Sequence, residues 1–146
     1  MFGGTFVQAD LTYLDLSGNF ITKIESGSFE PLQKLETLIF GEHNYINGSV
    51  LDAITTLKSL KTLDLSRADG IFEPPAELFD SLKDLEVLKL SGCSLPSLEP
   101  GAFASLKNLK QDATLEDPRI PVPWLLLSAR HPRIVAPYIV QQGDLT

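Results

Sequence analysis

One spacing of apolar residues, Leu-x-x-Leu-x-Leu, recurs along most of this 146-residue chain. It first occurs at Leu11, Leu14 and Leu16, and successive copies begin 24, 25, 25 and 24 residues apart, the last of them at Leu109. Neighbouring side chains of a β-strand point to opposite faces, so the second and third leucines of each copy point inward together. The sequence therefore predicts stacked units, each with one short strand, that share a continuous core. The later copies begin at Leu35, Leu60 and Leu85.

The apolar pattern continues after each predicted strand. A small or polar position follows the strand, an aliphatic residue comes two places later, and large apolar residues come ten and thirteen places later. The small or polar position is predicted to hold Asn19, Asn44, Asp69 and Cys93. The aliphatic position holds Ile21, Ile46, Ile71 and Leu95, and the two later positions hold Phe29, Ile54, Phe79 and Phe103, then Leu32, Leu57, Leu82 and Leu106. The extra residue of the second and third copies is predicted to lie just after their strands.

These motifs resemble the leucine-rich-repeat family from Leu11 to Leu109. The sequence Ser-Phe-Glu-Pro-Leu at 28–32 and its counterparts at 78–82 and 102–106 look like the 24-residue repeats of animal extracellular proteins, such as Toll-like receptors. The resemblance implies an α/β solenoid, right-handed and curved. A short parallel sheet would line its concave face, and irregular, 3-10 or short helical arms would form its convex side.

The repeats set the predicted domain boundaries. Residues 1–10 are the degenerate end of a preceding repeat, 11–111 are the solenoid with the start of a fifth copy, and 112–146 are a tail that contains five prolines. The four full repeats are predicted at 11–34, 35–59, 60–84 and 85–108. Asp112 and Thr114 occupy leucine positions of the fifth copy, so the periodicity ends there. The tail is predicted either to lack order or to cap the core irregularly.

The position after the strand has a structural explanation. A short amide can donate to the carbonyl groups of the turn and accept from an N–H group there, which Asn19 and Asn44 are able to do. Asp69 keeps only the acceptor. Cys93, the single cysteine of the chain, is predicted to be an inert buried thiol.

The outward strand positions form the predicted binding surface. On the concave face, in-register stacking places equivalent residues of successive copies side by side, and Lys61 between Glu36 and Glu86 can support the stack electrostatically. Glu42, His43 and Arg67 lie at the predicted extra residues, where a bulge can re-aim side chains. The candidate partner-binding residues are Tyr13, Asp15, Glu36, Ile39, Glu42, His43, Lys61, Asp64, Arg67 and Lys89.

Composition narrows the function further. The net charge of −7 disfavours binding to a nucleic-acid backbone. No apolar run approaches the roughly 18 residues of a membrane span. No phosphate-binding or nucleophile motif is found, and His43 and His131 lack metal-ligand spacing. The sequence therefore predicts neither an enzyme nor a cofactor or metal site.

Two interpretations of function remain. The first is a protein-binding module from a receptor-like or secreted recognition protein, at the cell surface or outside the cell, which binds a protein on its concave face. The second is a cytoplasmic structural or scaffolding repeat without a specific ligand. The start of the chain lacks the basic and apolar pattern of a signal peptide, so we expect a piece of a longer protein. Asn47-Gly48-Ser49 matches the glycosylation sequon, which makes Asn47 a candidate acceptor on an exposed arm.

Overall fold

The computed structural model describes residues 10–70, 77–90, 92–93 and 105–109. The predicted tail at 112–146 and the predicted repeat end, apart from Asp10, lie outside these residues, as do Ile71, Leu95 and Phe103. Within the described ranges, each of the four copies contributes one strand of a parallel sheet, in the order β1-β2-β4-β6. The strands are β1 (Tyr13–Asp15), β2 (Thr37–Ile39), β4 (Thr62–Asp64) and β6 (Val87–Lys89).

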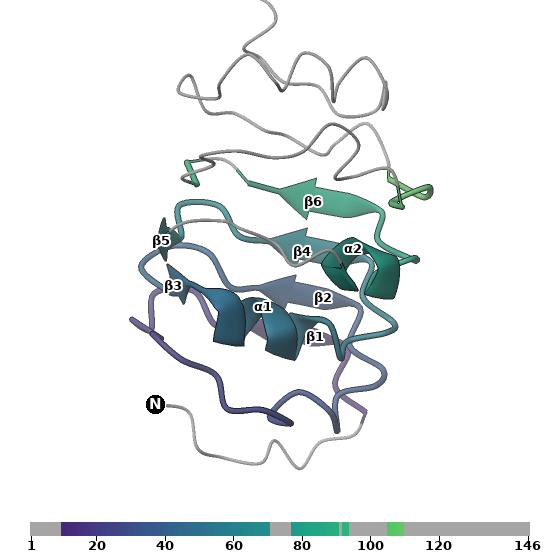
Figure 1. Cartoon of the computed structure of the whole chain (residues 1–146), viewed down its shortest axis with the longest axis horizontal. Helices are drawn as coiled ribbons and strands as arrows, with labels where there is room; N and C mark the ends of the chain where they lie inside the picture. The colour runs from purple at the N-terminus through teal and green to yellow at the C-terminus, as the bar shows by residue number, and fades with distance from the viewer. Residues whose placement is uncertain (1–9, 71–76, 91, 94–104, 110–146) are drawn as a thin grey trace, which may run out of the picture.

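The register of this sheet is the one that the sequence predicts. Leu14 pairs with Leu38, Leu38 with Leu63, and Leu63 with Leu88 across the parallel strands. Figure 1 shows the strands stacked one above another along the solenoid. The repeat spacing of 24 or 25 residues therefore brings equivalent residues into contact in space.

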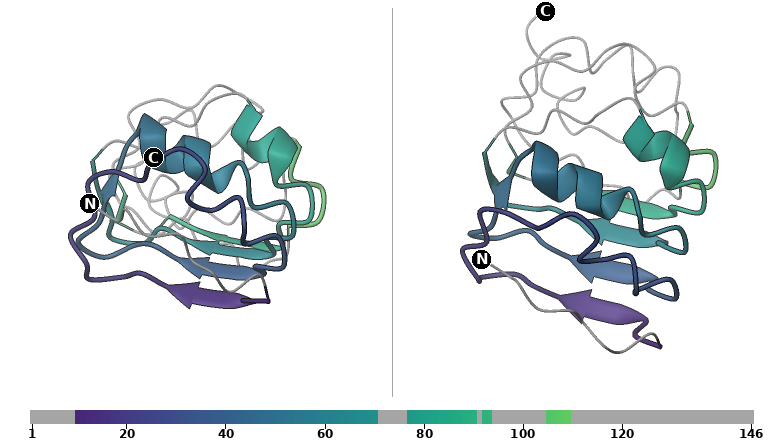
Figure 2. Two further views of the ribbon diagram at one scale, coloured as in Figure 1. Left: turned by 90° about the horizontal axis from the view of Figure 1, so that it is seen from below. Right: turned by 60° about the horizontal axis from the view of Figure 1, so that its bottom comes forward.

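A second, two-stranded parallel sheet lies beyond the carboxyl ends of these strands. It consists of β3 (Tyr45–Ile46) and β5 (Asp69–Gly70), with Tyr45 opposite Asp69. The chain then returns through helical arms, α1 (Gly48–Ile54) and α2 (Glu77–Ser81). Both helices lie on the opposite side of the solenoid from β1, β2, β4 and β6, as the two views in Figure 2 show.

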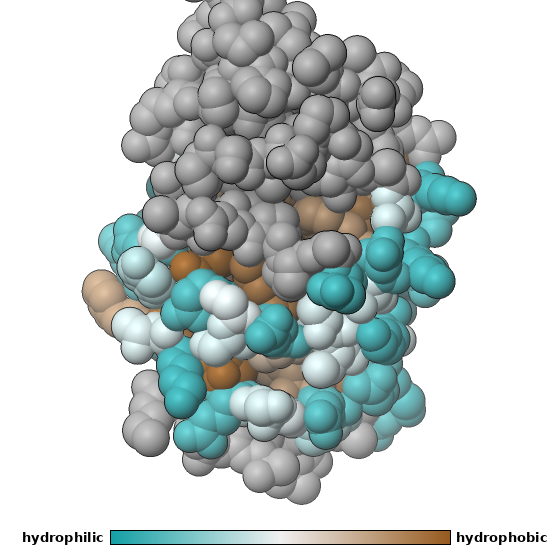
Figure 3. Space-filling view, viewed as in Figure 1, coloured by the Kyte–Doolittle hydropathy of each residue, from teal (hydrophilic) through white to brown (hydrophobic). Residues whose placement is uncertain are grey.

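Helix α1 forms because its first turn is capped and one side of it is apolar. Asn47 precedes it, and its side-chain Oδ1 accepts a hydrogen bond from the Val50 N–H at 3.2 Å, the usual role of an N-cap residue. Val50, Leu51 and Ile54 are all buried, and this spacing places them on one side of the helix. On the side that carries the helices, hydrophilic side chains cover much of the described surface (Figure 3).

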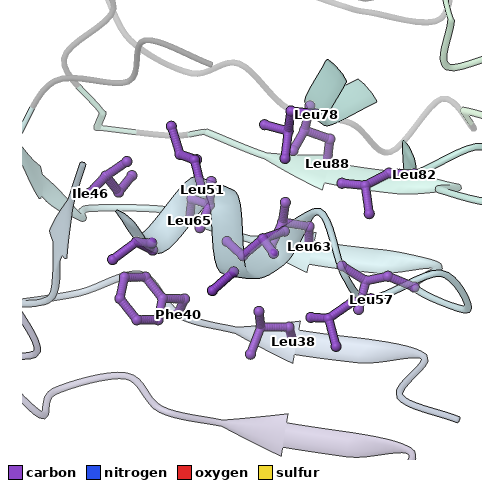
Figure 4. Close-up of a cluster of buried hydrophobic side chains, with 14 of the residues drawn as sticks. Leu38, Phe40, Ile46, Leu51, Leu57, Leu63, Leu65, Leu78, Leu82 and Leu88 are labelled. Atoms are coloured by element: carbon purple, nitrogen blue, oxygen red, sulfur yellow. The ribbon is translucent and has the colours of Figure 1, made fainter. Parts of the chain in front are cut away.

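The core fills the space between the sheet and the arms (Figure 4). It is made of the predicted inward leucines together with the apolar residues of the arms. Each such side chain, when fully buried, contributes roughly 1.5–3 kcal/mol. The buried side chains include Leu38 and Leu63 on the strands, Leu65 and Leu90 directly after β4 and β6, and Phe29, Ile54, Phe79, Leu32, Leu57, Leu82 and Leu106 on the arms. The predicted apolar core positions from Leu16 onwards are therefore confirmed within the described residues, whereas Leu11 and Leu14 of the first copy are only partly buried and pack against this core.

The turn after each strand has a shared backbone geometry. The residue two or three places after each strand's last inward side chain has positive φ in all four copies, although only the first and fourth are glycine: Gly18 at 73°, His43 at 66°, Arg67 at 59° and Gly92 at 75°. A side chain makes this left-handed conformation costly, whereas glycine adopts it readily. His43 and Arg67 are thus held in a conformation for which the other two copies use glycine.

The third copy departs from the prediction. Because Tyr45 lies opposite Asp69, the residue of the third copy that is equivalent to Asn44 is Ala68. Ala68 is buried at 4% exposure and Asp69 is exposed, so the assignment of Asp69 to the position after the strand was wrong. Burying the unpaired carboxylate would be costly. Only the second copy has its extra residue just after the strand; in the third copy it lies beyond Ala68.

We expect Gly18→Ala to destabilise the fold by about 1 kcal/mol. A Cβ at Gly18 would meet nothing within 4 Å, so the φ of 73° alone causes the loss. Gly48→Ala is the matched control, since its Cβ also meets nothing and its φ lies outside the left-handed range. Thermal unfolding followed by circular dichroism should show a lower melting temperature for Gly18→Ala only. An equal shift for both variants would contradict the turn geometry.

Candidate binding face

The predicted concave-face residues lie together on the outward side of the sheet and on the turns that follow it. We call the outward side chains of β1, β2, β4 and β6, with Glu36 and Lys61 beside them, the sheet face. Every predicted partner-binding residue is half-exposed or exposed. Tyr13, Asp15, Ile39, Asp64 and Lys89 lie on the strands, Glu36 and Lys61 precede β2 and β4, and Glu42, His43 and Arg67 lie in the turns. The predicted alternation of buried and exposed positions therefore holds.

Ion pairs join successive copies across this face. Lys61 Nζ lies 2.9 Å from Glu36 Oε1, and Lys89 Nζ lies 3.7 Å from Asp64 Oδ2. The expectation that the row through Lys61 supports the stack electrostatically agrees with this contact. Such surface pairs are individually worth at most about 1 kcal/mol. They hold long side chains in place, and they place positive and negative charges next to each other on the face.

Two of these side chains have shifted pKa values. The hydrogen bond and the charge of Glu36 raise the pKa of Lys61 above its ordinary value, and Glu86 acts in the same direction. The Ser17 hydroxyl and N–H group donate to Asp15 Oδ1 at 2.6 and 2.9 Å, which lowers the pKa of Asp15. Both groups are therefore charged at neutral pH.

A shallow hollow of about 390 Å³ opens at the carboxyl ends of the strands. Its lining includes the small residues Ser17, Gly41 and Ser66. A Cβ at Gly41 would lie 2.1 Å from the Ser66 carbonyl oxygen, so only glycine fits there. Its charged lining includes Glu42 and Arg67, whose Oε1 and Nη1 atoms are 3.9 Å apart. This contact is longer than a hydrogen bond and leaves both side chains open to other partners.

The structure also shows three exposed residues that the sequence analysis did not select. Phe20 is 71% exposed and Tyr45 is 46% exposed, and Asp69 lies next to Tyr45 across the β3–β5 pair. The ring of Phe20 stacks on His43, with a centroid distance of 5.3 Å and an interplanar angle of 13°. An aromatic residue directly after Asn19 and Asn44 was the available signal for the first two.

Buried turn groups hold the face in place. Asn44 is fully buried and donates from Nδ2 to the carbonyl oxygens of Leu16 and Phe40, at 2.7 and 2.6 Å. Its Oδ1 accepts from the Ile21 N–H at 2.8 Å. The predicted role of the amide is therefore confirmed at Asn44. The Cys93 thiol is buried and donates to the Leu65 carbonyl oxygen at 2.9 Å.

Asn47 has both of its side-chain polar atoms engaged. Besides capping α1, its Oδ1 accepts from the Ser49 hydroxyl at 2.8 Å, and its Nδ2 donates to the Thr22 carbonyl oxygen at 2.7 Å. The side chain is half-buried, rather than freely exposed as expected for the arm. Glycosylation at Nδ2 stays a proposal, and it would have to accommodate the contact with Thr22.

No helix among the described residues is both long enough and apolar enough to cross a membrane. Nor do the same residues contain a group of three histidine, cysteine, aspartate or glutamate side chains placed to hold a metal ion.

Comparisons with known proteins agree with the repeat pattern. A leucine-rich-repeat family model matches residues 9–69, and a second one matches residues 84–106. Tsukushi of Gallus gallus is 35% identical over 68% of this chain, and Receptor like protein 23 of Arabidopsis thaliana is 33% identical over 74% of it. The matched regions make up 27% of Tsukushi and 10% of the plant protein. The chain thus spans a small part of relatives from both animals and plants.

Solved structures show the same fold. The Toll–Spatzle complex of Drosophila contains a chain that matches 78% of this one with a TM-score of 0.56 and 22% identity, over 18% of its own length. Internalin C2 of Listeria monocytogenes matches 69% of this chain with a TM-score of 0.51 and 21% identity, over 50% of its own length. Both similarities concern the fold alone.

Proposed function

The chain belongs to the leucine-rich-repeat family, and we propose that it is a protein-binding module that holds a protein partner on its sheet face. The observation that carries this proposal is the arrangement of the outward side chains. They stand on four parallel strands, none of the selected residues is buried, and α1 and α2 lie on the opposite side (Figure 2). The fold alone does not determine function, so the argument rests on this face.

The sheet face has the physical properties of a recognition surface. Its backbone is fixed by the parallel pairing of the strands, so little backbone freedom is lost when a partner binds. It combines an exposed tyrosine, Tyr13, and an aliphatic residue, Ile39, with charged side chains. Aromatic and apolar contacts supply affinity in such surfaces, and charges supply orientation and specificity.

The relatives support a place in a recognition protein. Two of the most similar proteins from plants are named receptor-like proteins, and the Toll structure is a complex with Spatzle. We propose by analogy that this chain is part of a receptor-like or secreted protein and acts at the cell surface or outside the cell. The alternative, a structural repeat without a specific ligand, predicts that the sheet face has no partner.

Site-specific photo-crosslinking distinguishes the two functions. A benzoyl-phenylalanine at Thr62, in the middle of the sheet face, should yield a discrete cross-linked protein in extracts of the source organism. The same group at Asp52, which is exposed on α1, is the matched control and should yield none. Cross-linking from Asp52 alone would place the partner on the arms, and cross-linking from neither position would favour the structural repeat.

A further inference from the structure

We propose that the partner places an arginine or lysine side chain on the edge of the solenoid formed by Phe20, His43, Tyr45 and Asp69, which we call the turn edge. The inference rests on the proposed function, because it requires a protein partner. It adds a second contact area beside the sheet face and assigns the charge of the group that binds there.

The turn edge exposes two aromatic rings that do not belong to the core. Phe20 is 71% exposed and Tyr45 is 46% exposed. Phe20 stacks against His43 at 5.3 Å, and the ring of Tyr45 lies over the backbone of β5, where a Cβ at Gly70 would be 3.0 Å from Tyr45 Cε1. Contact with neighbouring copies thus fixes both rings and leaves part of each open. Exposed, positioned aromatic rings are typical of interaction sites.

Two of these residues also have unfavourable backbone conformations. Phe20 has φ of 54° and His43 has φ of 66°. A left-handed conformation is uncommon for a bulky residue that is not glycine, and such strain often accompanies a functional site. His43 shares this turn conformation with Gly18, Arg67 and Gly92, whereas Phe20 adopts it outside that row, and neither Phe20 nor His43 is buried.

Charge decides which group fits on these rings. Asp69 lies directly opposite Tyr45 in the β3–β5 pair, is exposed, and has no ion pair with another described residue. Arg67 lies two positions before Asp69, but its Nη1 is 3.9 Å from Glu42 Oε1 and it forms no ion pair with Asp69. An aromatic face beside an uncompensated carboxylate matches a cationic side chain, which gains from both. The net charge of −7 on the whole chain also attracts a positively charged partner.

The probe for the test is the peptide acetyl-Gly-Arg-Gly-Arg-Gly-amide, compared with the same peptide carrying citrulline, which keeps the shape of arginine without its charge. Each is titrated into the isotope-labelled full chain, and amide chemical shifts are followed by NMR. The arginine peptide should shift the amides of Phe20, His43, Tyr45 and Asp69. The affinity of the citrulline peptide should be lower than that of the arginine peptide by a factor of about five or more.

Variants test the two parts of the site separately. The double change Phe20→Ala/Tyr45→Ala should weaken binding of the arginine peptide about five-fold, and Asp69→Asn should weaken it about three-fold. The matched control is Asp52→Asn, an exposed acid on α1, outside both contact areas. Tyr13→Ala, at an exposed tyrosine of the sheet face, distinguishes the two areas. If the arginine binds at the turn edge, both changes leave its affinity within about two-fold of wild type. Circular dichroism establishes that each variant is folded.

Three results would overturn the proposal. They are equal binding of the citrulline peptide, no shift at the turn edge at millimolar peptide, and loss of binding in Tyr13→Ala instead of the Phe20/Tyr45 variant. The last result would move the basic group onto the sheet face and leave the proposed function intact. Cross-linking from Thr62 tests that function without the peptide, so the two proposals can fail independently.

Discussion

Replacing Leu63 with alanine should destabilise the fold by about 2–5 kcal/mol, the cost of a cavity in a packed core. Leu63 has no exposed surface, and it pairs with Leu38 on one side and with Leu88 on the other. It therefore contacts the cores of two neighbouring copies, and little of the surrounding structure can collapse into the space it leaves. Chemical unfolding followed by circular dichroism measures the loss.

The adjacent Thr62 provides the control for this prediction. Thr62 lies on the same strand, is half-exposed and points to the opposite face. Thr62→Ala should cost less than about 1 kcal/mol, which is the range of strand preference. Equal losses for the two variants would mean that the alternation of inward and outward residues on β4 is wrong.

Replacing Asn44 with alanine should cost about 1–3 kcal/mol for each buried group that is left without its partner. The affected groups are the Ile21 N–H and the carbonyl oxygens of Leu16 and Phe40. These atoms belong to two successive copies, so the variant weakens the junction between them. The free energy of unfolding, determined from urea titration, measures the effect.

Asn19 and His43 are the controls for Asn44. The Asn19 amide donates to the carbonyl oxygens of Leu16 and Ser17 but is exposed, so water can replace it in Asn19→Ala. His43 is exposed and immediately precedes Asn44. Both alanine variants should lose less than about 1 kcal/mol. A larger loss for His43→Ala than for Asn44→Ala would show that the histidine occupies the buried position.

The strand register could be predicted because two independent periods agree there. Alternation along each strand points Leu38 and Leu63 inward, and the spacing of the copies places one beside the other. The ion pair of Lys61 with Glu36 follows from the same register, since these residues are 25 positions apart. The alternation along each strand and the spacing of the copies together determine the register of the sheet.

The turn of the third copy could not be predicted by counting apolar residues. Counting back from Phe79 selects Asp69, because the position after the strand precedes the large apolar residue of the arm by the same number of residues in the other copies. The structure instead keeps the distance from Leu65 to the buried residue, which is Ala68. Alanine is too small to stand out in a pattern of large apolar side chains. The row of positive φ values, Gly18 and Gly92 with His43 and Arg67 between them, depends on backbone geometry that residue types only partly indicate.

The candidate site was predicted in part for a related reason. Residues of the sheet face follow from alternation on the strands, so their exposure was expected. Phe20 and Tyr45 lie beyond the strand ends, where the alternation along a strand no longer applies and an aromatic residue is usually assigned to the core. Their exposure depends on the left-handed turn at Phe20 and on the pairing of β3 with β5, neither of which the repeat pattern describes.

The central claim is that a protein partner binds on the sheet face. The most direct test is to block this face by a substitution and to measure the affinity for the cross-linked partner. Thr62 lies between Thr37 and Val87 in the register of the sheet, so Thr62→Trp places a bulky side chain in the middle of the face. We predict that this variant binds the partner about ten-fold or more weakly, because the partner meets a steric clash. Asp52→Trp, on α1, should bind as the wild type does. Full affinity in Thr62→Trp with a loss in Asp52→Trp would contradict binding on the sheet face.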